Sequence, residues 1–138
     1  MHQFFRWIVP FAALFLVSCG AQEAIEDASN EVTMFHNSLD SEDYEGIWRS
    51  TGPALREVTS QEDFTKLLSA VHLKLGDVES TEQVNWRVNS TTDGTFAIVV
   101  MDTVFVEGTG QETFTFQREG EGLNLVGYNI NSADMMIN

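Results

Sequence analysis

The sequence reads Phe96-Ala97-Ile98-Val99-Val100-Met101 shortly after the turn pair Asp93-Gly94. An Asp-Gly pair between two strand-like segments is a strong signal for a β-hairpin. A strand that is apolar at consecutive positions can be buried on both faces of a sheet. We therefore expect the central strand of an antiparallel sheet within residues 95–107.

Alternating polar and apolar residues predict three further strands around this run. They cover residues 84–89, 112–118 and 123–131, and glycine-containing turns at 108–110 and 119–122 separate the later ones. Successive strands joined by short turns form an antiparallel meander. The second half of the chain is therefore predicted to be a curved, four-stranded antiparallel sheet.

Before residue 78 the apolar residues recur every three or four positions, which is typical of helices. The stripe of the first helix consists of Ile25, Ala28, Val32, Phe35 and Leu39. Capping side chains at 40–43 precede a second, short helix that Gly52-Pro53 ends, and a third helix runs from Ser60 to Gly76. Helices followed by a meander indicate an α+β domain, with the N-terminal helices packed on one face of the sheet.

The N-terminal segment has the features of an export signal. Residues 7–17 are apolar, with Pro10 as the one interruption, and they are too few to cross a hydrocarbon core of about 30 Å as a helix. The next residues, Leu16-Val17-Ser18-Cys19-Gly20, resemble the lipobox of bacterial lipoproteins. The resemblance implies cleavage before Cys19 and acyl chains on that residue, which together attach the protein stably to a membrane.

This assignment divides the chain into four parts. They are a signal peptide at 1–18, a lipidated tether at 19–23, an α+β domain at 24–131 and a C-terminal tail at 132–138. Gly20 after the cysteine favours the outer membrane under the sorting rule that accompanies the lipobox resemblance. We expect the domain to lie in the bacterial cell envelope and to face the periplasm. Because Cys19 is the single cysteine, the domain has no intrachain disulfide.

The charge balance excludes several classes of partner. The chain has 21 acidic and 7 basic residues and a formal charge of −14. Phosphate backbones and acidic lipid headgroups repel such a surface, so we expect no nucleic-acid partner and no membrane contact besides the lipid on Cys19.

Several short motifs resemble the DUF4019 family of small bacterial proteins. They are Asp43-Tyr44 with Trp48, Ser60-Gln61-Glu62, Leu75-Gly76, Arg118-Glu119-Gly120-Glu121-Gly122 and Gly127-Tyr128. The resemblance covers about residues 24–130, although Phe64 and Leu123 stand where tryptophan is common in the family. It implies a cystatin-like or NTF2-like fold and no assigned activity.

Motifs for known chemistry are absent from the sequence. It has no Gly-rich phosphate loop, no Cys-x-x-Cys, no His-Glu-x-x-His and no Gly-x-Ser-x-Gly. His36 and His72 each flank an apolar helix stripe, and a shared metal or acid/base role is the alternative to simple exposure. The acidic residues at 40–45 lack the spacing of a calcium loop and are better explained as helix caps. We predict no metal and no cofactor.

Asp102 is the candidate for a catalytic group. If Phe96, Ile98 and Val100 face the helices, Asp102 shares that face, where a carboxylate in a pocket could act as a general base. Residues that could line such a pocket are Tyr44, Trp48, Trp86, Asp102, Phe105, Phe116 and Tyr128. The aromatic ones are equally explained as core residues.

These patterns lead to a prediction of function and to its alternatives. We expect a lipid-anchored envelope protein whose domain is a non-enzymatic binding or accessory module for a protein partner or a small ligand. One alternative is a small pocket enzyme of the hydratase or isomerase type with Asp102 as its base. Another is a homodimer that pairs through its sheet face.

Overall fold

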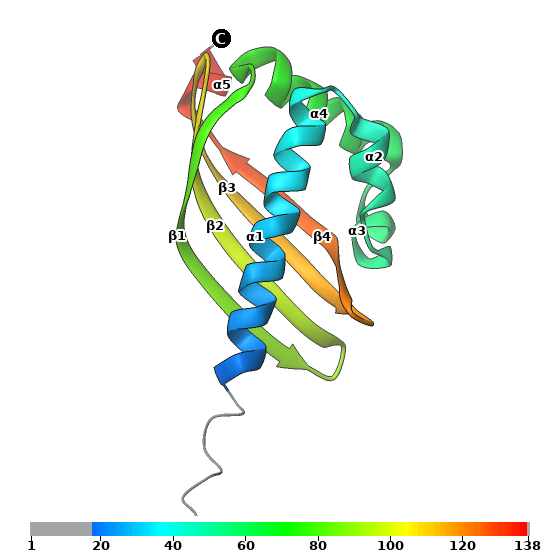
Figure 1. Cartoon of the computed structure of the whole chain (residues 1–138). Helices are drawn as coiled ribbons and strands as arrows, with labels where there is room; N and C mark the ends of the chain where they lie inside the picture. Colours follow the sequence, from blue (N-terminus) through cyan, green and yellow to red (C-terminus); the bar gives the residue numbers. More distant parts are fainter. Residues whose placement is uncertain (1–17, 138) are drawn as a thin grey trace, which may run out of the picture.

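The computed structural model describes residues 18–137, in which helices precede a sheet (Figure 1). In chain order the elements are α1 (Ser18–Asp40), α2 (Tyr44–Arg49), α3 (Pro53–Val58), α4 (Gln61–Leu75), β1 (Val78–Thr91), β2 (Gly94–Phe105), β3 (Gly108–Glu119), β4 (Gly122–Asn131) and α5 (Ala133–Ile137). The α+β class predicted from the sequence is confirmed. The predicted signal peptide lies outside the described residues, apart from Ser18.

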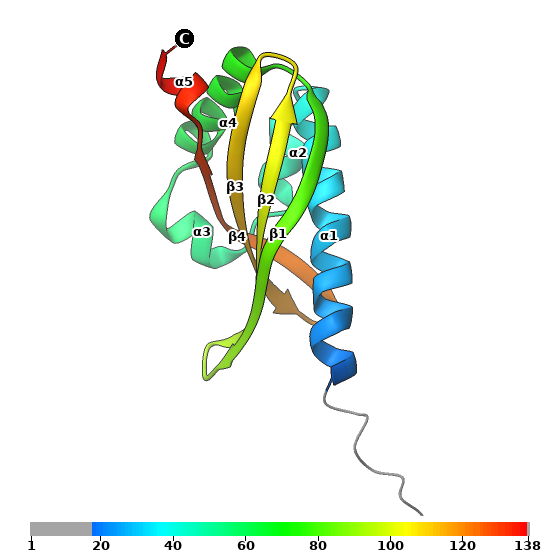
Figure 2. The same cartoon turned by 90° about the vertical axis from the view of Figure 1, so that its left-hand side faces the viewer.

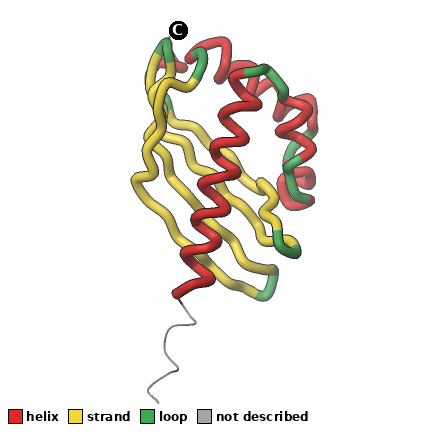
Figure 3. The backbone as a smooth tube through the Cα atoms, viewed as in Figure 1, coloured by secondary structure: helices red, strands yellow, loops and turns green. Residues whose placement is uncertain are grey.

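The four strands form one antiparallel sheet in the order β1-β2-β3-β4. Gly94 and Gly120, with φ of 132° and 62°, turn the chain between neighbouring strands in conformations that favour glycine. The sheet curves around α1, and the helices α1, α2 and α4 gather on its concave side (Figures 1 and 3). Figure 2 looks onto the opposite side of β1, β2 and β3, which these helices leave uncovered.

The register of β2 differs from the expectation. Val99 is fully buried toward the helices and pairs with Phe114 of β3. The buried side chains of β2 are Ala97, Val99, Met101, Thr103 and Phe105. The expectation that Phe96, Ile98 and Val100 face the helices is therefore wrong, since these half-buried side chains point to the other side. Side chains alternate along a strand, so a shift of one position exchanges the two faces.

The two long helices bury most of the stripes that their periodicity predicts, except Ile25 of α1, which is half-buried, and Leu67 of α4, which is 37% exposed. In α1 the side chains of Ala28, Val32, Phe35 and Leu39 are buried. The buried residues of α4 are Phe64, Leu68, Val71 and Leu75. Ser60 caps α4, because its hydroxyl accepts a hydrogen bond from Asp63 N at 3.1 Å. Helix α1 begins at Ser18, so it continues through the segment 19–23 that the sequence assigned to a tether.

Two short helices were not predicted from the sequence. Helix α3 begins with Pro53, and the preceding Gly52 donates its N–H to Leu125 O of β4 at 2.8 Å. Helix α5 lies in the tail, where Asp134 Oδ2 accepts a hydrogen bond from Thr109 N at 2.9 Å. Both helices are shorter than two turns, so tertiary contacts rather than apolar periodicity define them.

Within residues 18–137, no helix combines the length and the apolar character that crossing a membrane requires.

Candidate functional site

A carboxylate with no exposed surface lies between α1 and the sheet. Glu112 of β3 is 0% exposed, and three side chains donate hydrogen bonds to it. Oε1 accepts from Thr103 Oγ1 at 2.6 Å and from His36 Nε2 at 2.7 Å, and Oε2 accepts from Tyr128 OH at 2.7 Å. We call these four residues the Glu112 cluster. Burying a carboxylate is costly unless its oxygens are hydrogen-bonded, and both oxygens of Glu112 meet this condition.

Four elements build the Glu112 cluster. His36 comes from α1, Thr103 from β2 and Tyr128 from β4, so each element beside β3 supplies one partner. Thr103 is in turn hydrogen-bonded to Thr81 of β1 at 2.7 Å between the two hydroxyl oxygens. The network therefore joins the first helix to all four strands of the sheet.

Aromatic rings enclose the Glu112 cluster. The ring of Phe35 packs edge-on against Phe114, with centroids 5.0 Å apart, and lies 4.8 Å from the ring of Tyr128. Burial raises the pKa of Tyr128 well above its ordinary value, and the charge of Glu112 and the hydrogen bond to it act in the same direction. Because Glu112 is fully buried and His36 is 5% exposed, a ligand has no direct access to the carboxylate.

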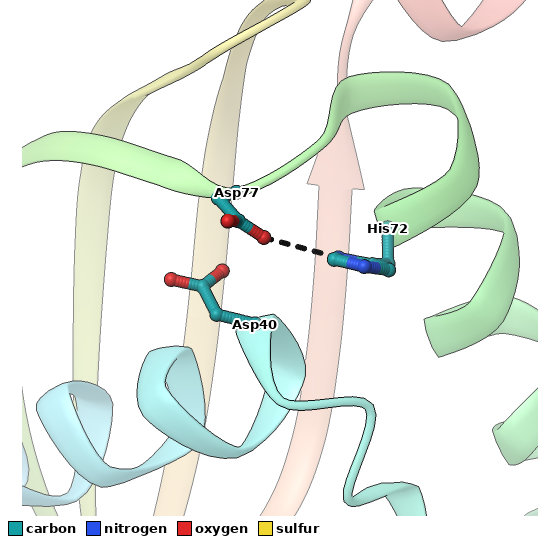
Figure 4. A group of neighbouring side chains, drawn as sticks. All are labelled: Asp40, His72 and Asp77. Carbon is teal, nitrogen blue, oxygen red and sulfur yellow. Dashed lines mark ion pairs between the residues drawn. The ribbon is translucent and has the colours of Figure 1, made fainter.

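A second polar cluster lies where α1 and α4 end and β1 begins. It consists of Asp40, His72 and Asp77, and we call it the Asp40 cluster (Figure 4). One potential ligand atom from each residue lies within 4.8 Å of those from the others. His36 and His72 thus belong to different clusters, so the structure does not support a site that they share.

Asp102 does not occupy the buried position predicted for it. Its side chain is exposed and accepts a hydrogen bond from Gln111 Nε2 at 3.1 Å. Asp102 lies two positions after Val100 in β2, so its side chain points to the same side of the sheet, away from the helices. It lines an open hollow of about 390 Å³ together with Gln111 and Ser132. A general base inside the concave side of the sheet is therefore excluded for Asp102.

The other residues proposed for a pocket are spread over the domain. Phe105 and Phe116 are core residues at 2% exposure, and Tyr128 belongs to the Glu112 cluster. Trp48 packs on Phe64 at 5.9 Å between ring centroids.

Two more of these residues lie apart from that core. The hydroxyl of Tyr44 is buried near Ser69 and makes no hydrogen bond of normal geometry to the described residues. Trp86 is 49% exposed beside the first turns of α1, where it borders a separate hollow. The described residues therefore do not gather the seven candidates around one cavity.

A family model was found to match residues 32–128, and its description reads "Protein of unknown function (DUF4019)". This segment holds every residue of both clusters. The chain belongs to the DUF4019 family. No curated protein matches it.

Sequence reasoning missed the central residue of the Glu112 cluster in this DUF4019 domain. Glu112, Phe114 and Phe116 lie at alternate positions of β3, so their side chains share one face of the strand. The alternating pattern of the sequence had already identified that face as apolar. A carboxylate on that face must be buried and needs donors. That signal was present in the sequence, although its partners could not be named without the fold.

The side of the DUF4019 sheet away from the helices carries few charges. Its central residues are Phe96, Ile98, Val100 and Val104 of β2 with Thr113, Thr115 and Gln117 of β3, and we call them the outer sheet face. Register pairs Val100 with Thr113 and Ile98 with Thr115, so the apolar and hydroxyl side chains form one continuous patch. None of these seven residues is ionisable, although Asp102 lies between Val100 and Val104 on the same side of β2, and Arg87 of β1 pairs with Ile98 at the border of the patch.

Proposed function

We propose that this protein is a lipid-anchored component of the bacterial cell envelope whose domain binds another protein and has no enzymatic activity. The observation that carries the proposal is the outer sheet face, whose centre at Ile98, Val100, Thr113 and Thr115 carries no charge. Ile98 and Val100 at its centre are half-buried, Val104 is 40% exposed, and the helices cover only the opposite side. Depletion of charge at the centre of a patch is a mark of protein–protein interfaces.

The concave side of the sheet supports a binding module more than a pocket enzyme. It is filled by aromatic rings and by the Glu112 cluster, in which both carboxylate oxygens are hydrogen-bonded. An enzyme of this size would need an accessible group in a pocket. Asp102, the candidate base, lies in an open and exposed hollow instead.

The proposed anchor is a lipid on Cys19. The lipobox-like segment 16–20 supports it, and the residue after the cysteine favours the outer membrane with the domain in the periplasm. Because α1 runs from Ser18 to Asp40, an acylated Cys19 would hold the domain next to the bilayer by its first helix.

The anchor is tested by Cys19→Ala in the native host. We expect the wild type to incorporate labelled fatty acid and to sediment with membranes, and the variant to do neither. Serine in place of Ala21 serves as a neighbouring control that should leave both properties unchanged. Unaltered labelling of the Cys19→Ala variant would refute the anchor.

The binding surface is tested by a photo-reactive amino acid at Thr113, a half-buried position of the outer sheet face. We expect a crosslinked adduct in native membranes, and no adduct from the same group at Asn30, an exposed position of α1. Adding Ile98→Lys should abolish the Thr113 adduct, because it places a charge in an uncharged patch. An adduct of twice the chain mass would identify a second copy as the partner.

Two results would refute the binding surface. One is the absence of any adduct from Thr113, and the other is an adduct that survives Ile98→Lys in a variant that still folds. In the second case the partner would contact the domain without using the outer sheet face.

A further inference from the structure

The ends of α1 and α4 and the start of β1 bring Asp40, His72 and Asp77 together. Asp40 is the last residue of α1, His72 lies in the last turn of α4, and Asp77 directly precedes β1. Figure 4 shows the three side chains converging between these elements. His72 Nδ1 lies 3.9 Å from Asp77 Oδ1, which is too far for a direct hydrogen bond.

Two features of the Asp40 cluster are left uncompensated: one imidazole nitrogen of His72 and the negative charge of the two carboxylates. His72 Nδ1 is buried and has no hydrogen-bond partner. Within the described residues, no lysine or arginine forms an ion pair with Asp40 or Asp77. Asp40 is also a carboxylate at the C-terminus of a helix, where the helix dipole disfavours negative charge. A cation among these three residues would relieve each of these deficiencies.

From these observations we propose that Asp40, His72 and Asp77 bind a divalent transition-metal ion, with Zn²⁺ as the best fit. Zn²⁺ takes imidazole nitrogen and carboxylate oxygen at about 2.0–2.2 Å, and three protein ligands leave one position for water. Ca²⁺ and Mg²⁺ prefer ligand sets made entirely of oxygen, so the histidine selects against them.

Small side-chain movements convert the observed arrangement into a coordination sphere. Ligand atoms around tetrahedral Zn²⁺ lie roughly 3.4 Å apart, compared with the 4.8 Å limit of the present cluster. Two of the three ligands are held in place: Asp40 Oδ1 accepts a hydrogen bond from Val78 N at 3.1 Å, and the side chain of His72 is 16% exposed. The side chain of Asp77 is 62% exposed and is free to rotate toward the other two.

The bound ion would join the ends of α1 and α4 to the start of β1. With water as its fourth ligand, the ion would fix the corner at which the helices meet the sheet. It does not depend on the binding surface proposed above, since none of its ligands belongs to the outer sheet face.

The test uses the full-length protein with Cys19→Ala, stripped of metal and free of a histidine tag, so that no thiol competes for zinc. Calorimetric titration with ZnCl₂ should show that one equivalent binds. Thermal unfolding of the zinc-loaded protein should give a higher Tm than that of the metal-free protein. His72→Gln and Asp77→Asn should each weaken binding at least tenfold, because each removes a ligand. Asp102→Asn is the matched control: it removes an exposed carboxylate elsewhere and should leave binding unchanged.

Two outcomes would overturn the metal site. One is the absence of saturable Zn²⁺ binding by the folded protein. The other is binding that His72→Gln and Asp77→Asn leave intact, which would place the ion on other surface carboxylates. Since Asp77 is largely exposed, Asp77→Asn is expected to fold even if His72→Gln does not.

Discussion

Glu112 is a buried carboxylate whose stability depends on donors from three different elements. Each of its oxygens accepts at least one hydrogen bond, and its side chain has no contact with solvent. Oε1 accepts two of these hydrogen bonds and Oε2 accepts one, so removing the Tyr128 hydroxyl leaves Oε2 without a donor at a position that water does not reach. The cost of such an unsatisfied buried group is about 1–3 kcal/mol, which exceeds the net contribution of an ordinary hydrogen bond.

Tyr128→Phe should therefore destabilise the domain by about 1–3 kcal/mol, because it removes the single donor to Glu112 Oε2. Urea denaturation at neutral pH measures this loss. Tyr44→Phe is the matched control, since among the described residues the hydroxyl of Tyr44 interacts with Ser69 but makes no hydrogen bond of normal geometry, so its removal should cost less than the loss of the Tyr128 hydroxyl. Equal losses in the two variants would show that the bond to Glu112 contributes nothing specific.

The raised pKa of Tyr128 predicts a loss of stability in alkali. The folded protein holds this proton more tightly than the unfolded chain does, so the stabilisation is complete below the unfolded pKa of about 10. It is lost as the pH rises from there through the pKa of the folded state. The unfolding free energy of the wild type should thus fall more steeply above about pH 10 than that of Tyr128→Phe. Parallel curves for the two proteins would contradict this assignment.

At the scale of elements, β2 shows what the sequence pattern can and cannot determine. Period-three and period-four stripes identified most of the buried faces of α1 and α4, since the apolar residues of each helix are concentrated on one side. The run Phe96–Met101 is apolar at every position, so its sequence contains no signal for the face that packs on the helices. That choice is made by pairing with β3, where Phe114 lies opposite Val99.

Val99 and Val100 test this register with identical chemistry at adjacent positions. Val99→Ala should cost about 2 kcal/mol, since it empties space in a close-packed core. Val100→Ala should cost less than half as much, because this side chain is half-buried on the outer sheet face. Chemical denaturation of both variants gives the comparison. A larger loss for Val100→Ala would mean that the faces are reversed.

Two acidic residues of helix α1, Asp27 and Glu31, lie one turn apart and repel each other. Partial burial, followed by the charge of Asp27 one turn away, raises the pKa of Glu31. The associated stabilisation is present below the unfolded pKa of about 4.3 and is lost as the pH rises through the folded value. At neutral pH, Glu31→Gln should therefore stabilise the domain by a few tenths of a kcal/mol.

The control for this prediction is Glu26→Gln, at an exposed position of the same helix. It should leave the Tm nearly unchanged at neutral pH. The gain from Glu31→Gln should also disappear in acid below about pH 4, where the carboxylic acid is neutral in both states. A gain that persists there would point to packing rather than charge as its cause.

At the scale of the whole molecule, the sequence predicted the architecture better than it predicted either cluster. Periodicity and turn residues are local, and they suffice for the order of helices and strands. The Asp40 cluster joins positions 40, 72 and 77 only after α1 and α4 have packed on the sheet. The same holds for His36 and Glu112, which are 76 positions apart in the chain.

The net charge of −14 leads to a last prediction, which concerns salt. Three ion pairs with lysine or arginine occur among the described residues, and two of them join exposed side chains one helical turn apart, where such pairs contribute little. Repulsion among the acids should therefore outweigh local attraction.

Raising the ionic strength from about 0.01 to 0.15 M shortens the screening length from about 30 to 8 Å. The Tm should rise over this range, most of all in metal-free protein, in which the carboxylates of the Asp40 cluster are not neutralised. A Tm that falls with salt would show that local pairs such as Arg118–Asp27 dominate, because screening weakens attraction and repulsion alike.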